Sequence, residues 1–546
     1  MSRKGILWLW FALLLAVALK AALLMAQVVP FNSDEAVVAL MARHITQGER
    51  PIFFYGQAYM GSLDAFLVAG GFHLFGEHVW VIRAVQTALY LGTIFTTVLL
   101  GRQLLGSWET GLLAAFLMAV PTVNVTLYTT VSLGGYGEAL LLGNLMLLVG
   151  GKFLHAGGPS GKAAFGWSAV LGFLIGLGVW AFGLSLVYAL PAALALVVGG
   201  GRWTVADGRQ TTDNGLRSTV YGLRSTLIGL LLGALAGAFP IWIFAAQHGF
   251  GVLLREFGGG AIAGVVPAAW WMQPFLHLFN LLLLGSTVTM GLRPPWEVRW
   301  LALPLLPLVM GLWLMAFTHG VRRLGRNAPH RRQYAMLLGA GIMLAVLFVL
   351  TPFGVDPSGR YFLPLLVPMS LVASDMFLSW RAYIGRWVFA FAALLMVYNL
   401  IGTWQSARTF PPGLTTQFDA IAQVDHRSLP DLMAFLQAHG ERRGYTNYWV
   451  AYPLAFHSQE ALIFVPRLPY HEDFRYTSRD DRYPPYDALV AEAERAAYIT
   501  THHPALDARL REYFAAQGAT WQETQIGDYH VFYALSKKVA PPVWDR

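Results

Sequence analysis

Residues 6–29 read ILWLWFALLLAVALKAALLMAQVV, an apolar run in which only Lys20 and Gln27 are strongly polar. A helix of this length crosses a hydrocarbon core of about 30 Å. The run follows Ser2, Arg3 and Lys4, and positive charge before a span is typical of the cytoplasmic side of a membrane. The run is longer than a signal-peptide core and has no small-residue cleavage site after it, so we expect a retained first span with a cytoplasmic N-terminus.

The composition extends this prediction to most of the chain. Of the 546 residues, 56% are hydrophobic and 12% are charged, whereas soluble domains have roughly 25% charged residues. We expect about 11 spans, with 13 as an upper bound, near residues 6–29, 80–105, 107–127, 138–155, 164–180, 184–199, 223–246, 298–321, 333–353, 361–380 and 387–405. The sequence therefore predicts a polytopic α-helical protein of the plasma (inner) membrane.

The distribution of charge sets the expected orientation. Residues 1–407 hold 24 Lys and Arg against 13 Asp and Glu, and residues 408–546 hold 14 against 17. The net charge of +8 therefore comes from segments between spans, which argues against nucleic-acid binding. The five arginines between residues 322 and 332 should be cytoplasmic, so we expect residues 274–292 to be re-entrant or interfacial rather than spanning. Cysteine is absent, which excludes disulfides and thiolate metal sites.

The chain changes character near residue 408, where charged residues become frequent. We expect a membrane module over residues 1–407 and a soluble α/β domain outside the cytoplasm over residues 408–546. The patterns predict helices at 429–439 and 487–495, and strands at 448–452, 461–465, 497–500 and 529–534. Tyr445, Tyr448, Trp449 and Tyr452 are typical of core packing, with a sugar-binding face as the alternative. We interpret the pairs at 480–481 (Asp-Asp) and 502–503 (His-His) as surface residues without zinc spacing.

The first external loop, after residue 29, is expected to hold two juxtamembrane helices. Residues 34–47 have an amphipathic pattern, and Ser33 or Asp34 could cap that helix. Residues 58–75 form a second mixed segment interrupted by glycines and by Asp64. We expect both segments to lie at the membrane surface.

Acidic residues are scarce in the membrane module, and four are expected at its outer surface: Asp34, Glu35, Asp64 and Glu138. A charged group there is costly unless water, a partner or a substrate compensates it. One such carboxylate could act as general base on an acceptor hydroxyl or amine while a second orients that acceptor. The alternative reading is helix capping by Asp34 and a hydrogen bond between Glu138 and either Tyr136 or an amide at the end of the span.

Basic residues are expected at the same surface. Arg360 and Tyr361 follow the short loop that begins at Asp356 and lead directly into an apolar span, which suits a lipid-linked phosphate. Contact with ordinary lipid headgroups is the alternative. Lys20 lies within the first span, where a charge is expensive unless the side chain reaches toward the interface.

The order of these features resembles the polyprenyl-phosphate-sugar-dependent glycosyltransferases of the GT-C superfamily, which include protein O-mannosyltransferases and lipid A aminoarabinose transferases. Residues 32–43 (NSDEAVVALMAR) resemble the acidic pair that begins the family's first juxtamembrane helix. Residues 75–76 (FG) and 81–83 (VIR) resemble the entry into its second span, and residues 358–364 (SGRYFLP) resemble a segment before a late span. The resemblance covers roughly residues 6–380.

The resemblance implies an inverting transfer in which polyprenyl phosphate leaves and an acceptor takes the sugar on the extracytoplasmic face. Asp34 would be the catalytic base, with Glu35 beside it and Glu138 as the second acid. The donor phosphate would be held by Arg360 and Tyr361, helped by Lys20 or Arg83. The sugar or acceptor would lie near Asp64, Tyr59 and Tyr136.

The expected partners are the lipid-linked donor and a protein, glycan or lipid acceptor. No resident metal or other cofactor is required by this resemblance, and divalent metal dependence is left open. The sequence departs from its relatives at residues 56–64 (GQAYMGSLD), where they commonly have proline, so the acceptor is left open as well. The main alternative is a non-enzymatic transporter or flippase of lipid-linked sugars, although no second half mirrors the first. A membrane anchor for an active soluble tail is the third alternative.

Overall fold

The computed structural model describes residues 1–155, 158–200, 213–258, 271–356, 358–409 and 413–544. Within that part of the chain, six helical segments are long and apolar enough to cross a membrane: residues 3–25, 79–105, 161–181, 303–322, 331–350 and 360–408. Counting the bent pair at residues 222–237 and 239–248 as one span makes seven. The polytopic helical architecture is thus confirmed, whereas the count of about 11 spans stays a prediction.

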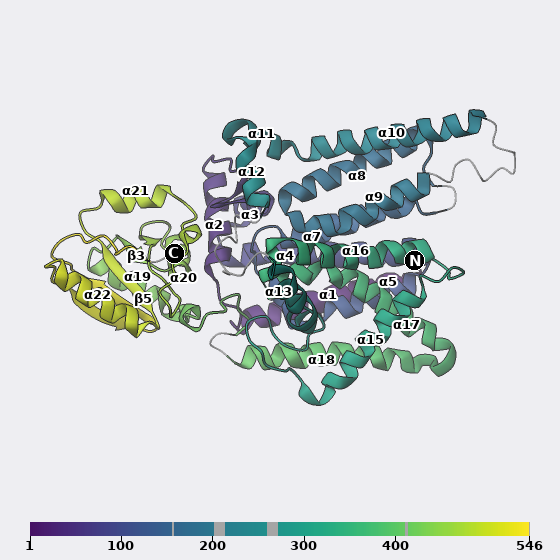
Figure 1. Cartoon of the computed structure of the whole chain (residues 1–546). Helices are drawn as coiled ribbons and strands as arrows, with labels where there is room; N and C mark the ends of the chain where they lie inside the picture. The colour runs from purple at the N-terminus through teal and green to yellow at the C-terminus, as the bar shows by residue number, and fades with distance from the viewer. Residues whose placement is uncertain (156–157, 201–212, 259–270, 357, 410–412, 545–546) are drawn as a thin grey trace.

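The helices form one bundle (Figure 1). Its members are α1 (Arg3–Met25), α4 (Val79–Leu105), α5 (Trp108–Ala119), α6 (Val123–Tyr128), α7 (Tyr136–Lys152), α8 (Gly161–Ala181), α9 (Leu186–Gly200), α10 (Asp213–Gly237), α15 (Leu306–Arg322), α16 (Arg331–Leu350), α17 (Leu366–Ile384) and α18 (Val388–Arg408). Glycines let α8 and α10 approach closely, because a Cβ on Gly172 would lie 2.0 Å from the Leu230 carbonyl oxygen. Many side chains on the outer helices are apolar and exposed, which suits lipid as the solvent.

Shorter elements cover one end of the bundle. They are α2 (Ser33–Thr46), the antiparallel pair β1 (Phe53–Phe54) and β2 (Gln57–Gly61), α3 (Leu63–Phe75), α11 (Phe239–His248), α12 (Phe250–Phe257), α13 (Gln273–Phe279) and α14 (Ser286–Thr289). A π-helical segment, Asn280–Gly285, joins α13 to α14. The two helices expected in the first external loop are present, but β2 takes the first residues of the second segment. The cap of α2 is Asn32, whose side chain accepts from the Glu35 amide, and not Ser33 or Asp34.

The C-terminal unit, residues 413–544, contains a five-stranded sheet of order β4-β3-β5-β7-β6. Strands β3 (Arg443–Thr446), β4 (Ile463–Pro466) and β5 (Ala497–Thr501) are parallel, and β7 (Tyr529–Tyr533) and β6 (Gln522–Ile526) continue antiparallel. The helices are α19 (Leu429–Ala438), α20 (Tyr448–His457), α21 (Pro485–Glu492) and α22 (Pro504–Ala516). Residues 448–452, expected as a strand, belong to α20, and the sequence did not indicate β3, β6 or α22.

The C-terminal unit packs on the end of the bundle where α2 lies, and the N-terminus is at the opposite end (Figure 1). Helix α2 lies against α20, and its side chains are almost all buried. Polar contacts cross this junction: Asn32 Nδ2 donates to Thr416 Oγ1 at 2.8 Å, and an Arg43 nitrogen donates to the Phe456 carbonyl at 3.1 Å. The junction therefore buries the loop that carries the predicted acidic residues.

Candidate active site

Asp34 lies in the first turn of α2, where the unpaired amides of a helix N-terminus favour a carboxylate. Its Oδ1 accepts a hydrogen bond from the Tyr448 hydroxyl of the C-terminal unit at 2.5 Å. The neighbouring Ser33 hydroxyl donates to the Tyr448 carbonyl, so α20 is held at two points. Asp34 is thus partly exposed at the junction between the bundle and the C-terminal unit.

Glu35 and Arg83 pair with each other inside the protein. The two guanidinium donors reach the two carboxylate oxygens at 3.0 and 2.9 Å, and Glu35 is 0% exposed. This bidentate pair links α2 to α4. Our interpretation of Glu35 as a catalytic acid and Arg83 as a phosphate ligand does not match these contacts, because each group is already satisfied by the other.

Asp64 and Glu138 form a second, separate pair of acids. Asp64 begins α3, accepts from Gln86 Nε2 at 2.7 Å and from the Ser132 hydroxyl, and interacts with the carboxyl group of Glu138. Burial raises the pKa of Asp64 to about 6, against the lowering effect of these hydrogen bonds. Among the described residues, neither oxygen of Glu138 meets a hydrogen-bond donor. This geometry suits a proton shared between the two carboxyl groups.

Arg360 lies in the loop region before α17, where it begins the 3₁₀ turn Arg360–Leu365. Its Nε is 2.5 Å from Asp356 Oδ2, and its guanidinium lies 5.0 Å from the centre of the Tyr361 ring. The Asn124 side chain donates to the Gly359 carbonyl at 3.1 Å and fixes this turn on α6. Four phenols interact electrostatically with the guanidinium, and we call them the tyrosine cluster: Tyr59, Tyr128, Tyr136 and Tyr361.

Lys20 is buried, and its ammonium is already hydrogen-bonded. Its ammonium donates to the Thr129 carbonyl at 2.6 Å, to the Thr129 hydroxyl at 2.8 Å and to the Thr130 hydroxyl at 2.9 Å. An ammonium has three donors, so none is left for a phosphate. Lys20 therefore joins α1 to the end of α6, and the expectation that it assists donor binding does not match its position.

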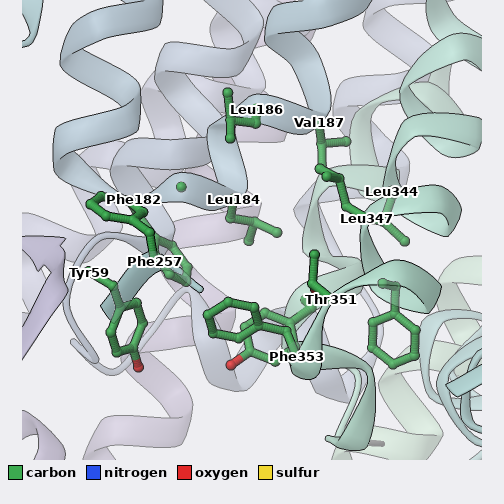
Figure 2. Close-up of a pocket in the computed structure, with 13 residues that line it drawn as sticks. Tyr59, Phe182, Leu184, Leu186, Val187, Phe257, Leu344, Leu347, Thr351 and Phe353 are labelled. Carbon is green, nitrogen blue, oxygen red and sulfur yellow. The ribbon is translucent and has the colours of Figure 1, made fainter. Parts of the chain in front are cut away.

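An apolar cavity of about 160 Å³ adjoins the tyrosine cluster (Figure 2). Tyr59 and Tyr361 belong to both, and the rest of the lining is almost entirely aliphatic or aromatic: Phe182, Gly183, Leu184, Leu186, Val187, Phe257, Leu344, Leu347, Phe348, Thr351 and Phe353. In Figure 2 the Tyr59 hydroxyl points away from Leu184 and Leu186. The cavity thus has an apolar body and a phenolic rim next to a cation.

Two residues of the C-terminal unit reach this region without having been predicted. The Arg482 guanidinium lies 5.4 Å from the centre of the Tyr448 ring and interacts with the charges of Asp34 and Asp480. Asp480 is buried, not a surface residue as expected, and burial raises its pKa to about 7. Their sequence context is a charged, soluble-like tail, which carries no signal that marks these two positions.

Tyr59 is the point at which the separate parts of the site meet. Burial raises the pKa of its hydroxyl, whereas the charges of Arg360 and Arg482 lower it, and the charge of Asp34 acts on it as well. These groups come from α2, β2, the loop before α17 and the C-terminal unit. Asp34 and Arg360 therefore both act electrostatically on Tyr59, whereas Glu35, Arg83 and Lys20 are held in other contacts and Asp64 pairs with Glu138.

The described part of the chain contains no evident binding site for a resident metal ion. No group of three or more His, Cys, Asp or Glu side chains there is arranged to hold one. The anionic and cationic groups around Tyr59 alternate instead, which suits a substrate that brings both a proton to remove and a negative charge to bind.

Comparison with solved structures finds proteins of similar fold, and two of these structures are of ArnT. ArnT from Cupriavidus metallidurans, bound to undecaprenyl phosphate, has a TM-score of 0.56 and 13% identity over 99% of this chain and 100% of that chain. Its apo form has a TM-score of 0.57 and 12% identity over 95% and 97%. ArnT is a GT-C superfamily member. This chain has the GT-C fold.

The match to ArnT extends over nearly the full length of both chains. Archaeal oligosaccharyltransferase AglB from Archaeoglobus fulgidus is also similar, with 14% identity over 97% of this chain and 74% of that one. Its TM-score is lower, at 0.47. No protein-family model and no curated protein matches the sequence. At such low identity the likeness confirms the fold expected from the resemblance. It does not assign a role to any residue of this chain.

Proposed function

We propose that this chain is a membrane glycosyltransferase that moves a sugar, a hexose or a pentose, from a polyprenyl-phosphate donor to an acceptor hydroxyl or amine. The observation that carries the proposal is that Asp34 and Arg360 both interact electrostatically with Tyr59, which lines an apolar cavity. The cavity suits a prenyl chain, and the cation beside its rim suits the phosphate. The ArnT structure with undecaprenyl phosphate supports this class of donor.

In the proposed reaction, the acceptor oxygen or nitrogen forms a bond to the anomeric carbon while the bond from that carbon to the phosphate oxygen breaks. The electron pair of the broken bond leaves with the phosphate, and the acceptor proton passes to Asp34. Direct displacement inverts the anomeric centre. Arg360 stabilises the charge on the departing phosphate, and since that phosphate is a stable anion, positioning accounts for much of the rate.

The proposed orientation follows the charge distribution. The N-terminus and the arginines between residues 322 and 332 lie in the cytoplasm, and the C-terminal unit covers the site on the extracytoplasmic face of the plasma (inner) membrane. In this arrangement a lipid-linked donor enters the apolar cavity from the bilayer. The acceptor, a protein, glycan or lipid, reaches Asp34 from the aqueous side.

The test begins with a deletion strain, because the acceptor must first be identified. Mass spectrometry of envelope glycans, glycolipids and glycoproteins should show a sugar that disappears on deletion and returns with the intact gene. Purified Asp34→Asn should then transfer that sugar about 10²- to 10⁴-fold more slowly than wild type, as expected for loss of a general base.

Asp431→Asn is the matched control, because Asp431 is exposed on α19 in the C-terminal unit. It should transfer at the wild-type rate. An Asp34→Asn variant as active as this control would remove Asp34 from its assigned role. Loss of the surface sugar in cells without any transfer in vitro would favour the flippase alternative.

A further inference from the structure

Arg482 differs from the other cations around the site because it has no ion pair. Arg360 pairs with Asp356, Arg479 pairs with Glu256 at 2.8 Å, and Arg83 pairs with Glu35. No carboxylate among the described residues lies within 4.0 Å of the Arg482 guanidinium, and its Nε has no hydrogen-bond partner there. The side chain is nevertheless only 9% exposed. A buried cation without a partner is costly unless a ligand supplies the anion.

The surroundings of Arg482 hold it in place without neutralising it. Its backbone amide donates to the Tyr452 hydroxyl, and its terminal nitrogens reach the Gln57 side-chain oxygen in the favoured orientation of that amide. Gly56, with φ of +70°, lets the β1–β2 turn approach, since a Cβ there would lie 3.1 Å from Arg482 Cδ. Asp480, the nearby acid of its own loop, has a pKa raised by burial to about 7, so near neutral pH it is only partly charged.

Arg482 and Arg360 come from different parts of the chain and interact electrostatically with the same hydroxyl. Both charges act on Tyr59, which lines the apolar cavity. One arginine comes from the loop before α17 and the other from the C-terminal unit. A phosphate at the rim of the cavity would therefore lie between two cations, each able to offer a planar fork of donors.

We propose that Arg482 binds the donor phosphate together with Arg360, so that the C-terminal unit supplies half of the anion site. This inference rests on the proposed function and adds to it a binding residue outside the membrane bundle. It also gives the C-terminal unit a direct part in holding the leaving group. The competing explanation is that Arg482 only balances the charge of Asp34 and never touches the lipid.

Binding of a phosphorylated lipid and of its neutral parent separates these explanations. The probes are undecaprenyl phosphate and undecaprenol, each titrated into the purified full-length protein in detergent without acceptor. Wild type should bind the phosphate at least tenfold more tightly than the alcohol, and Arg482→Gln should lose at least tenfold in affinity for the phosphate alone, as expected for a charge-assisted contact. Arg360→Gln should behave likewise.

Arg511→Gln is the control, because Arg511 pairs with Glu523 on the surface of the same unit. It should bind both lipids as wild type does. If Arg482→Gln retains full phosphate affinity while Arg360→Gln loses it, the inference is wrong and the proposed function stands. If wild type does not prefer the phosphate, the proposed function fails first. Should Arg482→Gln not fold, Arg482→Met removes the charge with an unbranched side chain, and unaltered phosphate binding by that variant would also count against the inference.

Discussion

The Tyr448 hydroxyl donates to Asp34 Oδ1 at 2.5 Å and joins the C-terminal unit to the carboxylate that we propose as the base. A fixed hydrogen bond on one oxygen leaves the other oxygen in a defined direction, toward the acceptor. Tyr448 is therefore a positioning residue in the proposed reaction, and its loss should slow the chemical step more than it weakens donor binding.

Tyr448→Phe should lower kcat about tenfold, the usual value of a hydrogen bond to a charged group, while the donor KM changes little. The measurement is steady-state transfer to the acceptor found by the envelope comparison. Tyr476→Phe is the control, since the Tyr476 hydroxyl bonds to the Pro466 carbonyl within the same unit. Equal kcat for the two variants, or a change confined to KM, would contradict a positioning role.

At this scale the sequence identified some site residues and could not identify others. Asp34 and Arg360 could be predicted because charges are rare in residues 1–407, so each one demands a reason. The same reasoning also selected Lys20, whose role is structural. The energetic cost of burying a charge does not show whether that charge binds a ligand or hydrogen-bonds to another helix. Arg482 lies in a tail with 14 basic residues, where a charge is ordinary and its burial depends on tertiary packing.

At the scale of elements, the pattern of residues 448–452 shows why part of the fold was misassigned. Residues Tyr448–Phe456 of α20 are all buried, so neither helical nor strand periodicity separates an inner from an outer face. The signal that was missed is Asn447, whose side chain accepts from the Trp449 amide and caps the helix. Strands β4, β5 and β7 were predicted, because their short apolar runs are bounded by turns.

The contact between α3 and α7 leads to a prediction about pH. The pKa of Asp64 is raised by burial to about 6, above its ordinary value of 3.8, so the folded protein binds a proton more tightly than the unfolded chain does. Its contribution to stability is therefore full below about pH 4 and is lost as the pH rises through 6.

Asp64→Asn keeps an acceptor for Gln86 and gives Glu138 a donor. At pH 8 this variant should therefore unfold at a higher temperature than wild type. Its unfolding temperature should also change less between pH 4 and pH 8. Thermal unfolding in detergent at these two pH values measures both effects. Glu109→Gln is the control, because Glu109 is exposed and pairs with Arg381 at the surface. A variant less stable than wild type at pH 8 would show that the charged form of Asp64 is the one that the fold requires.

At the scale of the whole molecule, the proposed function requires the C-terminal unit to lie on one side of the membrane and the loop between α17 and α18 on the other. The two lie at opposite ends of the bundle (Figure 1). We propose that the basic loops lie in the cytoplasm, as their positive charge indicates, and that the lipid-linked donor is consumed on the other side of the membrane.

The absence of cysteine from the sequence makes this orientation directly measurable. Val543, in the C-terminal unit, is 96% exposed, and Tyr383, at the end of α17, is 86% exposed. The experiment uses intact cells in which any outer layer of the envelope has been made permeable to the reagent. A membrane-impermeant maleimide should then label Val543→Cys and not Tyr383→Cys, because the bilayer protects only the cytoplasmic thiol. Disruption of the membrane should make both variants react equally. Labelling of Tyr383→Cys alone in intact cells would place the site of Asp34 and Arg360 in the cytoplasm, where the proposed direction of donor entry and acceptor approach no longer holds.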